Sequence, residues 1–247
     1  MKKVVLVTGS AKGIGAAIIR ELAKNNYDCI INYNTSLEEA KSLKEEVETL
    51  YNIKCLMIKA DITNEMEVDN MLKTIEENFG GVDILINNAS VDLSCMFEDK
   101  TIDIFKKTLD VNLIAAYSLS KKVFNYMKKK QWGRIVNISS TNGINTYFPM
   151  CLEYDASKAA LNSLTHNLAI QFAPYITVNA IAPGFIGTES ELKDYDEEFL
   201  NLELGKILLR RYGKPEEVAH LVRFLISDEA SYINNTIIRI DGGQYGS

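Results

Sequence analysis

Short apolar runs alternate along the whole chain with longer segments that have helical periodicity. The apolar runs lie at residues 4–8, 29–33, 54–60, 82–88, 133–140, 176–183 and 236–240. They are apolar nearly without interruption, which is typical of strands that are covered on both faces of a parallel sheet. Residues 36–51 repeat apolar side chains at helical spacing, with charges on the opposite face. The alternation predicts an α/β fold, a doubly wound sheet of about seven parallel strands with helices on both faces.

The chain carries no obvious internal boundary. No linker rich in Pro, Gly or Ser and no shift in composition interrupts it, so we expect residues 1–247 to form a single domain. The least regular stretch is residues 184–213, which follows the sixth apolar run and is polar with weak periodicity. Ligands bind beyond the carboxyl ends of the strands in an open α/β sheet. A loose insert at that point is therefore predicted to be a substrate lid.

Composition and charge narrow the class of protein. The 247 residues are 47% hydrophobic and 24% charged, and the formal net charge of −6 argues against a nucleic-acid binder or an anionic-membrane binder. The four cysteines form no CxxC pair and no cluster with histidine, so neither a metal site nor a redox dithiol is predicted. The apolar run at the N-terminus is too short for a signal peptide, and no stretch approaches a membrane span. We expect a cytoplasmic protein.

A glycine-rich turn follows the first apolar run. The stretch VLVTGSAKGIGAAI places Gly9, Gly13 and Gly15 between a predicted strand and a predicted helix. Glycines let the backbone turn tightly and approach a pyrophosphate, and the N–H groups that begin the helix then face the phosphates. In this context the turn predicts a dinucleotide site of the Rossmann type. The alternative is a plain turn between a strand and a helix.

The end of the second apolar run indicates which dinucleotide binds. An acidic residue there would hold the ribose 2′-OH of NAD, but INYNTS at residues 31–36 contains none. Lys12 adds a cation within the glycine-rich turn that would suit a 2′-phosphate. Both features favour NADP(H). Asp61 ends the third run, where it accepts a hydrogen bond from the adenine amino group or caps the next helix, with Thr63 as the competing cap.

The stretch EYDASKAAL at residues 153–161 places Tyr154 and Lys158 one helical turn apart. A free tyrosine, with a pKa of about 10, is a poor acid or base near neutral pH. A lysine on the same helix face favours the phenolate and lowers the tyrosine pKa toward the working range. The pair is therefore a candidate for proton transfer. By itself the spacing favours the alternative, two polar side chains on a solvated helix face.

Together these motifs resemble those of the short-chain dehydrogenase/reductase family, and the resemblance covers essentially the whole chain. The matching stretches are TGSAKGIG (8–15), NNAS (87–90), DVNL with Asn112, NISS (137–140), YDASK (154–158) and PGFIGT (183–188). Within the family, ITVNAIAPGFIGT and KPEEVAHLVRFL are most similar to bacterial 3-oxoacyl-acyl-carrier-protein reductases. The resemblance implies an oxidoreductase that transfers a hydride between NADP(H) and a carbonyl or alcohol.

The resemblance also implies a catalytic set of Asn112, Ser140, Tyr154 and Lys158. Tyr154 would transfer the proton, while Lys158 would hold the nicotinamide ribose. Asn112 would hold a water that relays protons to Lys158, or would be a buried amide that stabilises a helix kink. No residue is expected to bind a metal.

The substrate hydroxyl has two competing candidates. Counting back from Gly143, the SxxG register selects Ser140, and Ser139 would then point to the opposite side of the extended chain. The segment from Ser140 to Tyr154 is one residue longer than in relatives, so Thr141 is the alternative if the register shifts.

The remaining implied residues surround the cofactor. They are Gly9, Ser10, Lys12, Gly13, Ile14, Gly15, Tyr33, Asn34, Thr35, Asp61, Ile62, Asn88, Ala89, Ser90, Tyr154, Lys158, Pro183, Gly184, Ile186 and Thr188. Ser90 departs from the family pattern, because it replaces the usual glycine of the NNAG motif.

Departures from the subgroup pattern bear on the substrate. Gln131 and Pro174–Tyr175 stand where carrier-protein reductases usually have arginines that meet an acidic partner, although Lys128–Lys130 and Arg134 are near. The first substrate hypothesis is a 3-oxoacyl thioester, and the alternative is another small ketone or alcohol such as a sugar or steroid. A nucleotide-binding regulator without catalysis is a third hypothesis. Residues 90–100 and 145–153 are predicted to line the substrate pocket or to pack a lid on the core. Their apolar candidates are Met96, Phe97, Tyr147, Phe148, Met150 and Cys151.

Two predicted helices indicate self-association. Residues 105–127 and 157–173 carry apolar side chains on more than one face, which requires a second covering layer. Family members use these helices to form dimers and tetramers, so the resemblance implies a homotetramer with a small-molecule substrate and no nucleic-acid or membrane partner.

Overall fold

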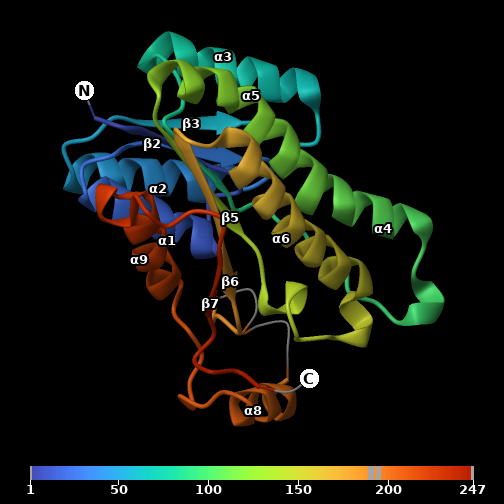
Figure 1. Cartoon of the computed structure of the whole chain (residues 1–247). Helices are drawn as coiled ribbons and strands as arrows, with labels where there is room; N and C mark the ends of the chain where they lie inside the picture. Colours follow the sequence, from blue (N-terminus) through green and yellow to red (C-terminus); the bar gives the residue numbers. More distant parts are fainter. Residues whose placement is uncertain (1, 189–191, 193–195, 246–247) are drawn as a thin grey trace.

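The computed structural model describes residues 2–188, 192 and 196–245. One parallel sheet with strand order β3-β2-β1-β4-β5-β6-β7 spans them, and each of the seven predicted apolar runs contains one strand (Figure 1). The strands are β1 (Val4–Val7), β2 (Asp28–Tyr33), β3 (Cys55–Lys59), β4 (Ile84–Asn87), β5 (Gly133–Ile138), β6 (Ile176–Pro183) and β7 (Ile237–Ile240). The predicted doubly wound Rossmann-type sheet is confirmed.

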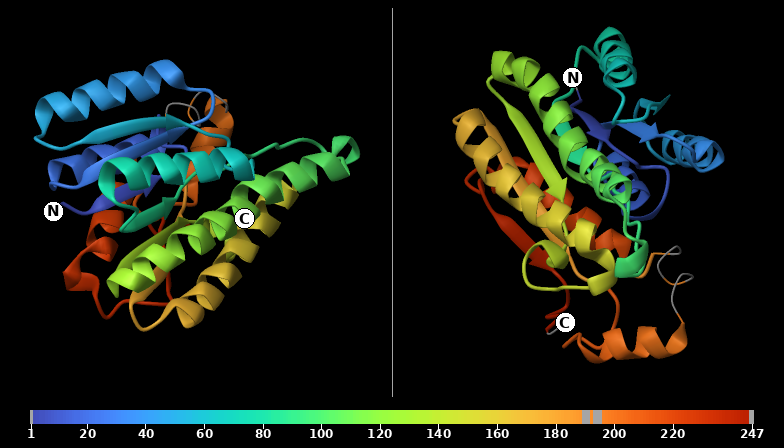
Figure 2. Two further views of the ribbon diagram at one scale, coloured as in Figure 1. Left: turned by 90° about the horizontal axis from the view of Figure 1, so that it is seen from above. Right: turned by 90° about the vertical axis from the view of Figure 1, so that its right-hand side faces the viewer.

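Helices cover both faces of the sheet (Figures 1 and 2). One face carries α1 (Gly13–Lys24), α2 (Leu37–Leu50) and α9 (Pro215–Ile226), and the other carries α3 (Glu65–Phe79), α5 (Ala115–Lys130) and α6 (Leu152–Phe172). Successive residues of β1 alternate between the two layers, because strand side chains have a period of two. Val5 and Val7 pack with the first group of helices, and Val4 and Leu6 pack with the second.

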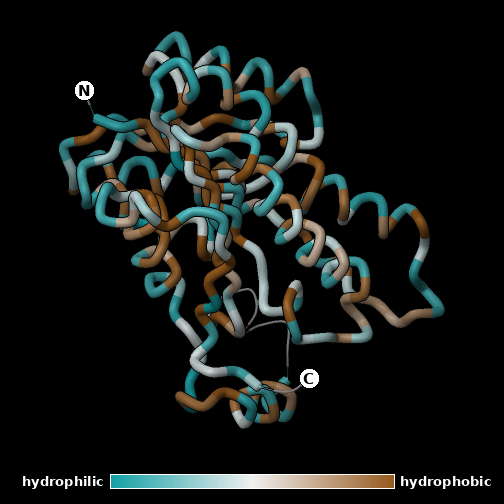
Figure 3. The backbone as a smooth tube through the Cα atoms, viewed as in Figure 1, coloured by the Kyte–Doolittle hydropathy of each residue, from teal (hydrophilic) through white to brown (hydrophobic). Residues whose placement is uncertain are grey.

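Apolar residues concentrate along the strands, and hydrophilic residues lie on the outer faces of the helices (Figure 3). All eight residues of β6 and all six of β5 are buried, as expected for the interior of a sheet covered on both sides. Cys29 and Cys55 are buried in neighbouring strands β2 and β3. No helix in the described part of the chain is long and apolar enough to cross a membrane.

The helix that follows β3 has an N-terminal cap that differs from both sequence-based candidates. The side chain of Asn64 accepts hydrogen bonds from the amides of Met66 and Glu67, so it caps α3. Asp61 instead accepts from the amide and the hydroxyl of Thr63, at 2.9 and 2.7 Å. The expectation that Asp61 or Thr63 caps the helix is therefore wrong, because α3 begins after Asn64 rather than at the strand end.

The predicted helix at residues 105–127 is divided. Helix α4 (Ile102–Leu109) passes through a π-helical segment, Asp110–Ile114, into α5. Insertions of this kind often mark functional positions. Beyond the carboxyl ends of β6 and β7 lies α8 (Glu197–Gly205), set apart from the other helices (Figure 1).

Strand order reverses at β1, whose neighbours are β2 on one side and β4 on the other. The connections from these strands leave in opposite directions, so a crevice opens at their carboxyl ends. That edge of the sheet carries the candidate site.

Candidate active site

Two adjoining cavities lie at the carboxyl edge of the sheet. The first, of about 530 Å³, is lined by Ser140, Tyr154 and Lys158 together with loops and α8. The second, of about 720 Å³, surrounds the glycine-rich turn and the end of β2. Ile14, Asn88, Ser90 and Thr188 line both cavities. An elongated ligand can therefore reach from the glycine-rich turn to Tyr154.

The glycine-rich turn has the backbone geometry of a phosphate cradle. Gly9 and Gly13 have φ values of 59° and 57°, in the left-handed region that favours glycine. A Cβ atom on Gly9 would lie 2.9 Å from the Cα of Ala89, and one on Gly13 would meet only the Thr188 side chain, 3.8 Å away across the cavity. The first turn of α1 contains no acidic residue. These features fit the pyrophosphate of a dinucleotide.

Nearly all predicted cofactor residues line one of the two cavities. Those on the larger cavity are Gly9, Lys12, Gly13, Ile14, Gly15, Tyr33, Asn34, Thr35, Asp61, Ile62, Asn88, Ala89, Ser90 and Thr188. Those on the smaller cavity include Pro183, Gly184 and Ile186. Ser10 is the exception, because it is fully buried, its amide donates to the carbonyl of Asn32 and its hydroxyl donates to the carbonyl of Val7. The structure gives Ser10 a role in shaping the turn.

The end of β2 presents polar, uncharged groups to the larger cavity. Asn32 braces the turn, since its Oδ1 accepts from the amide of Gly9 at 3.2 Å and its Nδ2 donates to the carbonyl of Ala60 at 3.0 Å. Lys106 and Lys107 of α4 line the same cavity as Lys12. The sequence motifs did not identify these two lysines, because only the packing of α4 brings them to the turn.

Lys158 occupies an unusual environment for a lysine. Its side chain is almost completely buried, and its ammonium donates to the carbonyl of Ile138 at 2.9 Å. The ammonium lies 5.3 Å from the centre of the Tyr154 ring. Burial lowers the pKa of Lys158 to about 8. The ammonium is therefore charged at neutral pH and sits beside the tyrosine, on the same face of α6.

The two adjacent serines after β5 have different partners. The hydroxyl of Ser139 donates to the carbonyl of Lys158 at 3.3 Å, which ties β5 to α6. Ser140 begins a 3₁₀ turn, Thr141–Gly143, and within the described part of the chain its hydroxyl exchanges hydrogen bonds with Asn142. A Cβ on Gly143 would lie 2.6 Å from the carbonyl carbon of Lys158, so this glycine allows the turn to pack on α6. The geometry favours Ser140, whose partners are local and exchangeable, as the substrate hydroxyl.

Asn112 lies behind the cavity wall, inside the π-helical segment. Its Oδ1 accepts from the amide of Val91 at 2.8 Å and from the hydroxyl of Ser90 at 3.2 Å. Its Nδ2 donates to the carbonyl of Val91 and to the hydroxyl of Ser157, both at 3.0 Å. The side-chain amide has no hydrogen-bonding capacity left for a bound water. It joins α6 to the loop after β4, as a buried amide at a helix irregularity would.

An ion pair joins the two loops that surround the smaller cavity. The ammonium of Lys100 donates to the carboxylate of Glu153 at 2.5 Å and to the carbonyl of Met150 at 2.8 Å. Glu153 is completely buried, and its second oxygen, Oε1, is without a hydrogen-bond partner. Lys100 therefore ties the loop after β4 to the segment that enters α6 directly before Tyr154.

Half of the apolar residues expected in the substrate pocket lie in it. Phe148, Met150 and Cys151 line the smaller cavity. Met96, Phe97 and Tyr147 do not, and all three are exposed on the outer side of their loops. For these three residues the prediction is wrong, because an irregular loop has no periodicity from which the direction of a side chain can be inferred. Phe199 of α8 also lines the cavity, with its ring centre 6.4 Å from that of Phe148.

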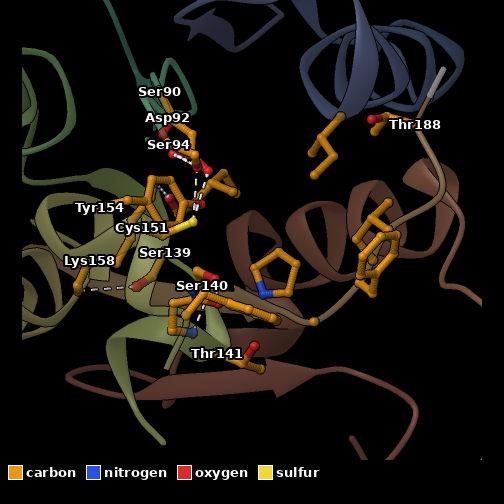
Figure 4. Close-up of a pocket in the computed structure, with 18 of the residues that line it drawn as sticks. Ser90, Asp92, Ser94, Ser139, Ser140, Thr141, Cys151, Tyr154, Lys158 and Thr188 are labelled. Carbon is orange, nitrogen blue, oxygen red and sulfur yellow. Dashed lines mark hydrogen bonds between the residues drawn. The ribbon is translucent and has the colours of Figure 1, made fainter. Parts of the chain in front are cut away.

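A polar group that sequence motifs did not identify also lines the smaller cavity (Figure 4). The hydroxyl of Ser94 donates to Asp92 Oδ1 at 2.6 Å and lies 3.0 Å from the sulfur of Cys151. The thiol of Cys151 donates to Asp92 Oδ2 at 3.5 Å. Burial raises the pKa of Cys151 to about 12, so the sulfur stays protonated.

Sequence comparison places this architecture within a family. The profile of short chain dehydrogenases matches residues 3–198. The chain belongs to the short-chain dehydrogenase family. It is 37% identical to a 3-oxoacyl-acyl-carrier-protein reductase of Aquifex aeolicus over 98% of this chain and 97% of that protein. It is also 37% identical to an acetoacetyl-CoA reductase of Rhizobium meliloti, over 99% of both chains.

Not all relatives of this short-chain dehydrogenase are named for the reduction of acyl thioesters. A glucose 1-dehydrogenase of Bacillus subtilis is 34% identical over 98% of this chain and 94% of that protein. Among solved structures, a mutant short-chain dehydrogenase/reductase of Serratia marcescens aligns with a TM-score of 0.91 at 34% identity, over 98% of this chain and 97% of that one. The family consists of oxidoreductases that use a nicotinamide cofactor, and its members act on small molecules.

Proposed function

We propose that this short-chain dehydrogenase is an NADP(H)-dependent enzyme that interconverts a carbonyl and an alcohol, with a 3-oxoacyl thioester as its first candidate substrate. The observation that carries the proposal is the buried ammonium of Lys158 beside the ring of Tyr154, in a cavity continuous with that of the glycine-rich turn. A buried cation next to a tyrosine favours the phenolate and prepares the hydroxyl for proton transfer.

The bound nicotinamide supplies or accepts the hydride. Tyr154 donates its hydroxyl proton to the oxygen of the substrate carbonyl as that oxygen gains negative charge, and Lys158 stabilises the resulting phenolate. Ser140 orients the same oxygen by a hydrogen bond, for which its hydroxyl leaves Asn142. A proton relay at Asn112 would use its main-chain carbonyl, since its side-chain amide is already fully hydrogen-bonded.

The preference for NADP(H) over NAD(H) is part of the proposal. Tyr33, Asn34 and Thr35 supply no carboxylate at the end of β2, so a 2′-phosphate meets no negative charge there. Lys12 and Lys106, both lining the cavity, are available cations for that phosphate. Asp61 also lines the cavity, and its Oδ1 accepts from Thr63, so Oδ2 is the oxygen proposed to accept from the adenine amino group.

The substrate proposal rests on relatives and on cavity chemistry. Relatives named as 3-oxoacyl-acyl-carrier-protein and acetoacetyl-CoA reductases support a 3-oxoacyl thioester, as do the apolar side chains of Phe148, Met150 and Phe199. Gln131 and Tyr175 present no charge to an acidic carrier protein, which favours a small thioester. A small hydroxylated carbonyl is the second candidate, favoured by the glucose dehydrogenase relative and by the carboxylate of Asp92.

We also propose that residues 1–247 act as one domain in which 184–213 form a substrate lid. Helix α8 brings Phe199 to the cavity, and Tyr212 supports the helix through a hydrogen bond to the carbonyl of Leu200 at 2.5 Å. Residues 189–191 and 193–195 of the proposed lid lie outside the described part of the chain. Closure of α8 over the substrate would exclude water from the reacting carbonyl.

A homotetramer is proposed for the assembly. Several large apolar side chains of α4, the π-helical segment, α5 and α6 are exposed, namely Ile102, Ile114, Tyr117, Leu152 and Ile170. Neighbouring apolar side chains of this kind are typical of surfaces that bind another chain. Sedimentation at micromolar concentration tests this proposal, and a monomer would contradict it.

The enzymatic proposal is tested by NADPH oxidation with a short 3-oxoacyl thioester, measured beside NADH and beside Tyr154→Phe. We expect turnover with NADPH that falls by roughly 10²–10⁴-fold in the variant, while the affinity for NADPH is unchanged. A faster reaction with NADH would contradict the cofactor assignment. NADPH binding without turnover on the thioester or on a panel of ketones and alcohols would instead indicate a non-catalytic regulator.

A further inference from the structure

One wall of the substrate cavity is formed by Asp92, Ser94 and Cys151, which lie together in Figure 4. Asp92 and Ser94 come from the loop after β4, and Cys151 comes from the turn that precedes α6, three residues before Tyr154. The hydroxyl of Ser94 donates to one carboxylate oxygen of Asp92, at 2.6 Å, and the thiol of Cys151 donates to the other, at 3.5 Å. The three side chains form one polar wall next to the proposed proton donor.

The hydroxyl and thiol protons of this wall already take part in hydrogen bonds within it. Ser94 and Cys151 have one proton each. The hydroxyl of Ser94 donates to Asp92, and the thiol of Cys151 can donate to Asp92 or to the oxygen of Ser94. The carboxylate of Asp92 retains unused lone pairs, because a carboxylate can accept about four hydrogen bonds. The oxygen of Ser94 retains lone pairs as well. The wall therefore offers hydrogen-bond acceptors to a ligand and no free donor.

Charge on the cavity reinforces this preference. Among the described residues that line it, Lys158 is the only lysine or arginine, and its ammonium is held by the carbonyl of Ile138. Asp92 is the only acidic residue among them. An anionic substituent at the polar wall would be repelled by the Asp92 carboxylate, while the ammonium of Lys158 is engaged by the carbonyl of Ile138. Phe148, Phe185 and Phe199 also line the cavity, and their side chains suit an uncharged apolar group.

We infer that Asp92 is a specificity-determining residue that selects substrates with a hydroxyl group next to the reacting carbonyl and rejects those with a carboxylate there. The inference favours the second substrate candidate, a small hydroxylated carbonyl, over the 3-oxoacyl thioester, and it rests on the proposed function for the position of the reacting carbon at Tyr154. The substrate class is an uncharged hydroxyketone, or the corresponding diol, with an apolar substituent on the other side of the reacting carbon. The hydroxyl donates to Asp92, and the apolar substituent packs against the phenylalanines.

The experiment measures binding rather than turnover, so that it does not depend on catalysis. Three alcohols differ only in the group next to the secondary alcohol carbon: 1-phenylethane-1,2-diol has a hydroxymethyl group, 1-phenylpropan-1-ol has an ethyl group and mandelate has a carboxylate. Each is titrated by calorimetry into the NADPH-loaded enzyme, where the reduced cofactor prevents oxidation of the alcohol. We expect the diol to bind about ten-fold more tightly than 1-phenylpropan-1-ol, and mandelate to bind most weakly.

Two variants assign the preference to the wall. Asp92→Asn preserves the size of the side chain, and we expect it to remove the roughly ten-fold preference for the diol and to strengthen mandelate binding. Asp99→Asn is the matched control, because Asp99 is an exposed acid of the same loop that does not line the cavity. It should leave all three affinities unchanged.

Several outcomes overturn the inference. They are equal binding of the diol and 1-phenylpropan-1-ol to the wild type, a preference that persists in Asp92→Asn, and the absence of binding by all three alcohols. Failure of the proposed function has a different signature. If no carbonyl substrate is reduced while the diol preference is present and is lost in Asp92→Asn, the specificity of the wall stands and the catalytic proposal does not.

Discussion

The two halves of the candidate site are built by different means. The cofactor half is made mainly of backbone, namely the glycine-rich turn and the ends of β1, β2 and β4. The substrate half is made of loops that long-range side-chain contacts hold in place, such as Lys100 with Glu153 and Ser94 with Cys151. A backbone cradle depends on a short continuous motif and tolerates little change. Walls made of side chains can change their chemistry one residue at a time, which is how one fold can serve many substrates.

The largest effect is expected at Lys158, which takes part in both halves of the proposed site. Lys158→Met removes the cation beside Tyr154, so we expect turnover to fall by 10²-fold or more. The same change removes a buried charge, so we expect a folded state that is about 1–2 kcal/mol more stable at neutral pH, even after loss of the bond to Ile138. Thioester reduction and thermal unfolding measure the two effects. Lower stability in the variant would contradict this account.

The pH dependence of stability follows from the same lysine. Burial lowers the pKa of Lys158 in the folded chain from 10.5 to about 8. Between these values the unfolded chain binds more protons than the folded chain, so the free energy of unfolding rises with pH across this window. The rise from this group is on the order of 3 kcal/mol, and below pH 8 its penalty is constant. The stability advantage of Lys158→Met over the wild type should therefore fall by about 3 kcal/mol between pH 8 and 10.5 and reverse in sign, and a constant difference would contradict the assignment.

The substrate half is expected to be destabilised by loss of the ion pair between Lys100 and Glu153. Lys100→Met leaves the fully buried carboxylate of Glu153 without its cation, and loss of one partner of a buried pair costs about 3–5 kcal/mol. We expect that loss of stability in chemical denaturation, and a higher KM for substrate in protein that remains folded. The double variant Lys100→Met with Glu153→Leu should recover most of the stability. If the double variant is no more stable than Lys100→Met, the buried charge is not the cause.

The cofactor half is expected to be disrupted by a substitution at Gly9. Gly9→Ala places a Cβ 2.9 Å from Ala89 at a φ of 59°, so we expect a cost of about 1–3 kcal/mol and weaker NADPH binding. Gly80→Ala is the matched control, since Gly80 also has a positive φ, of 84°, but has nothing within 4 Å of an added Cβ. The control should cost about 1 kcal/mol from backbone strain alone and leave NADPH affinity intact. Equal effects of the two changes would show that the contact with Ala89 is unimportant.

The smallest expected effect concerns the apolar wall. Phe199→Ala removes a ring on α8 that approaches Phe148 across the smaller cavity. We expect the KM for an apolar ketone or thioester to rise by several-fold, equivalent to about 1 kcal/mol, with kcat and NADPH affinity little changed. Steady-state kinetics with a short and a longer acyl chain measure it, and the longer chain should lose more. An equal rise in KM for both chains would place Phe199 away from the acyl group.

Residues that lie in short continuous motifs were predictable. The glycine-rich turn, Tyr154 with Lys158, and Asn88 after β4 depend on neighbours a few positions away, and the structure brings them to one edge of the sheet. Ser10 lies within such a motif and yet points inward, because its hydroxyl completes the turn through the carbonyl of Val7. The exposed position of Met96 could not be predicted from the sequence either, because an irregular loop has no side-chain periodicity.

The sequence by itself determined the sheet, its two helical layers and the cofactor turn, because strand burial, helix periodicity and glycine geometry are local properties of the chain. Only the tertiary structure decided the chemistry of the substrate cavity. Ser94 and Cys151 lie 57 positions apart, and Lys100 and Glu153 lie 53 apart, so their contacts exist only after the loops have packed on the finished sheet. The direction in which Asp92 presents its carboxylate depends on those contacts, and no local pattern encodes it.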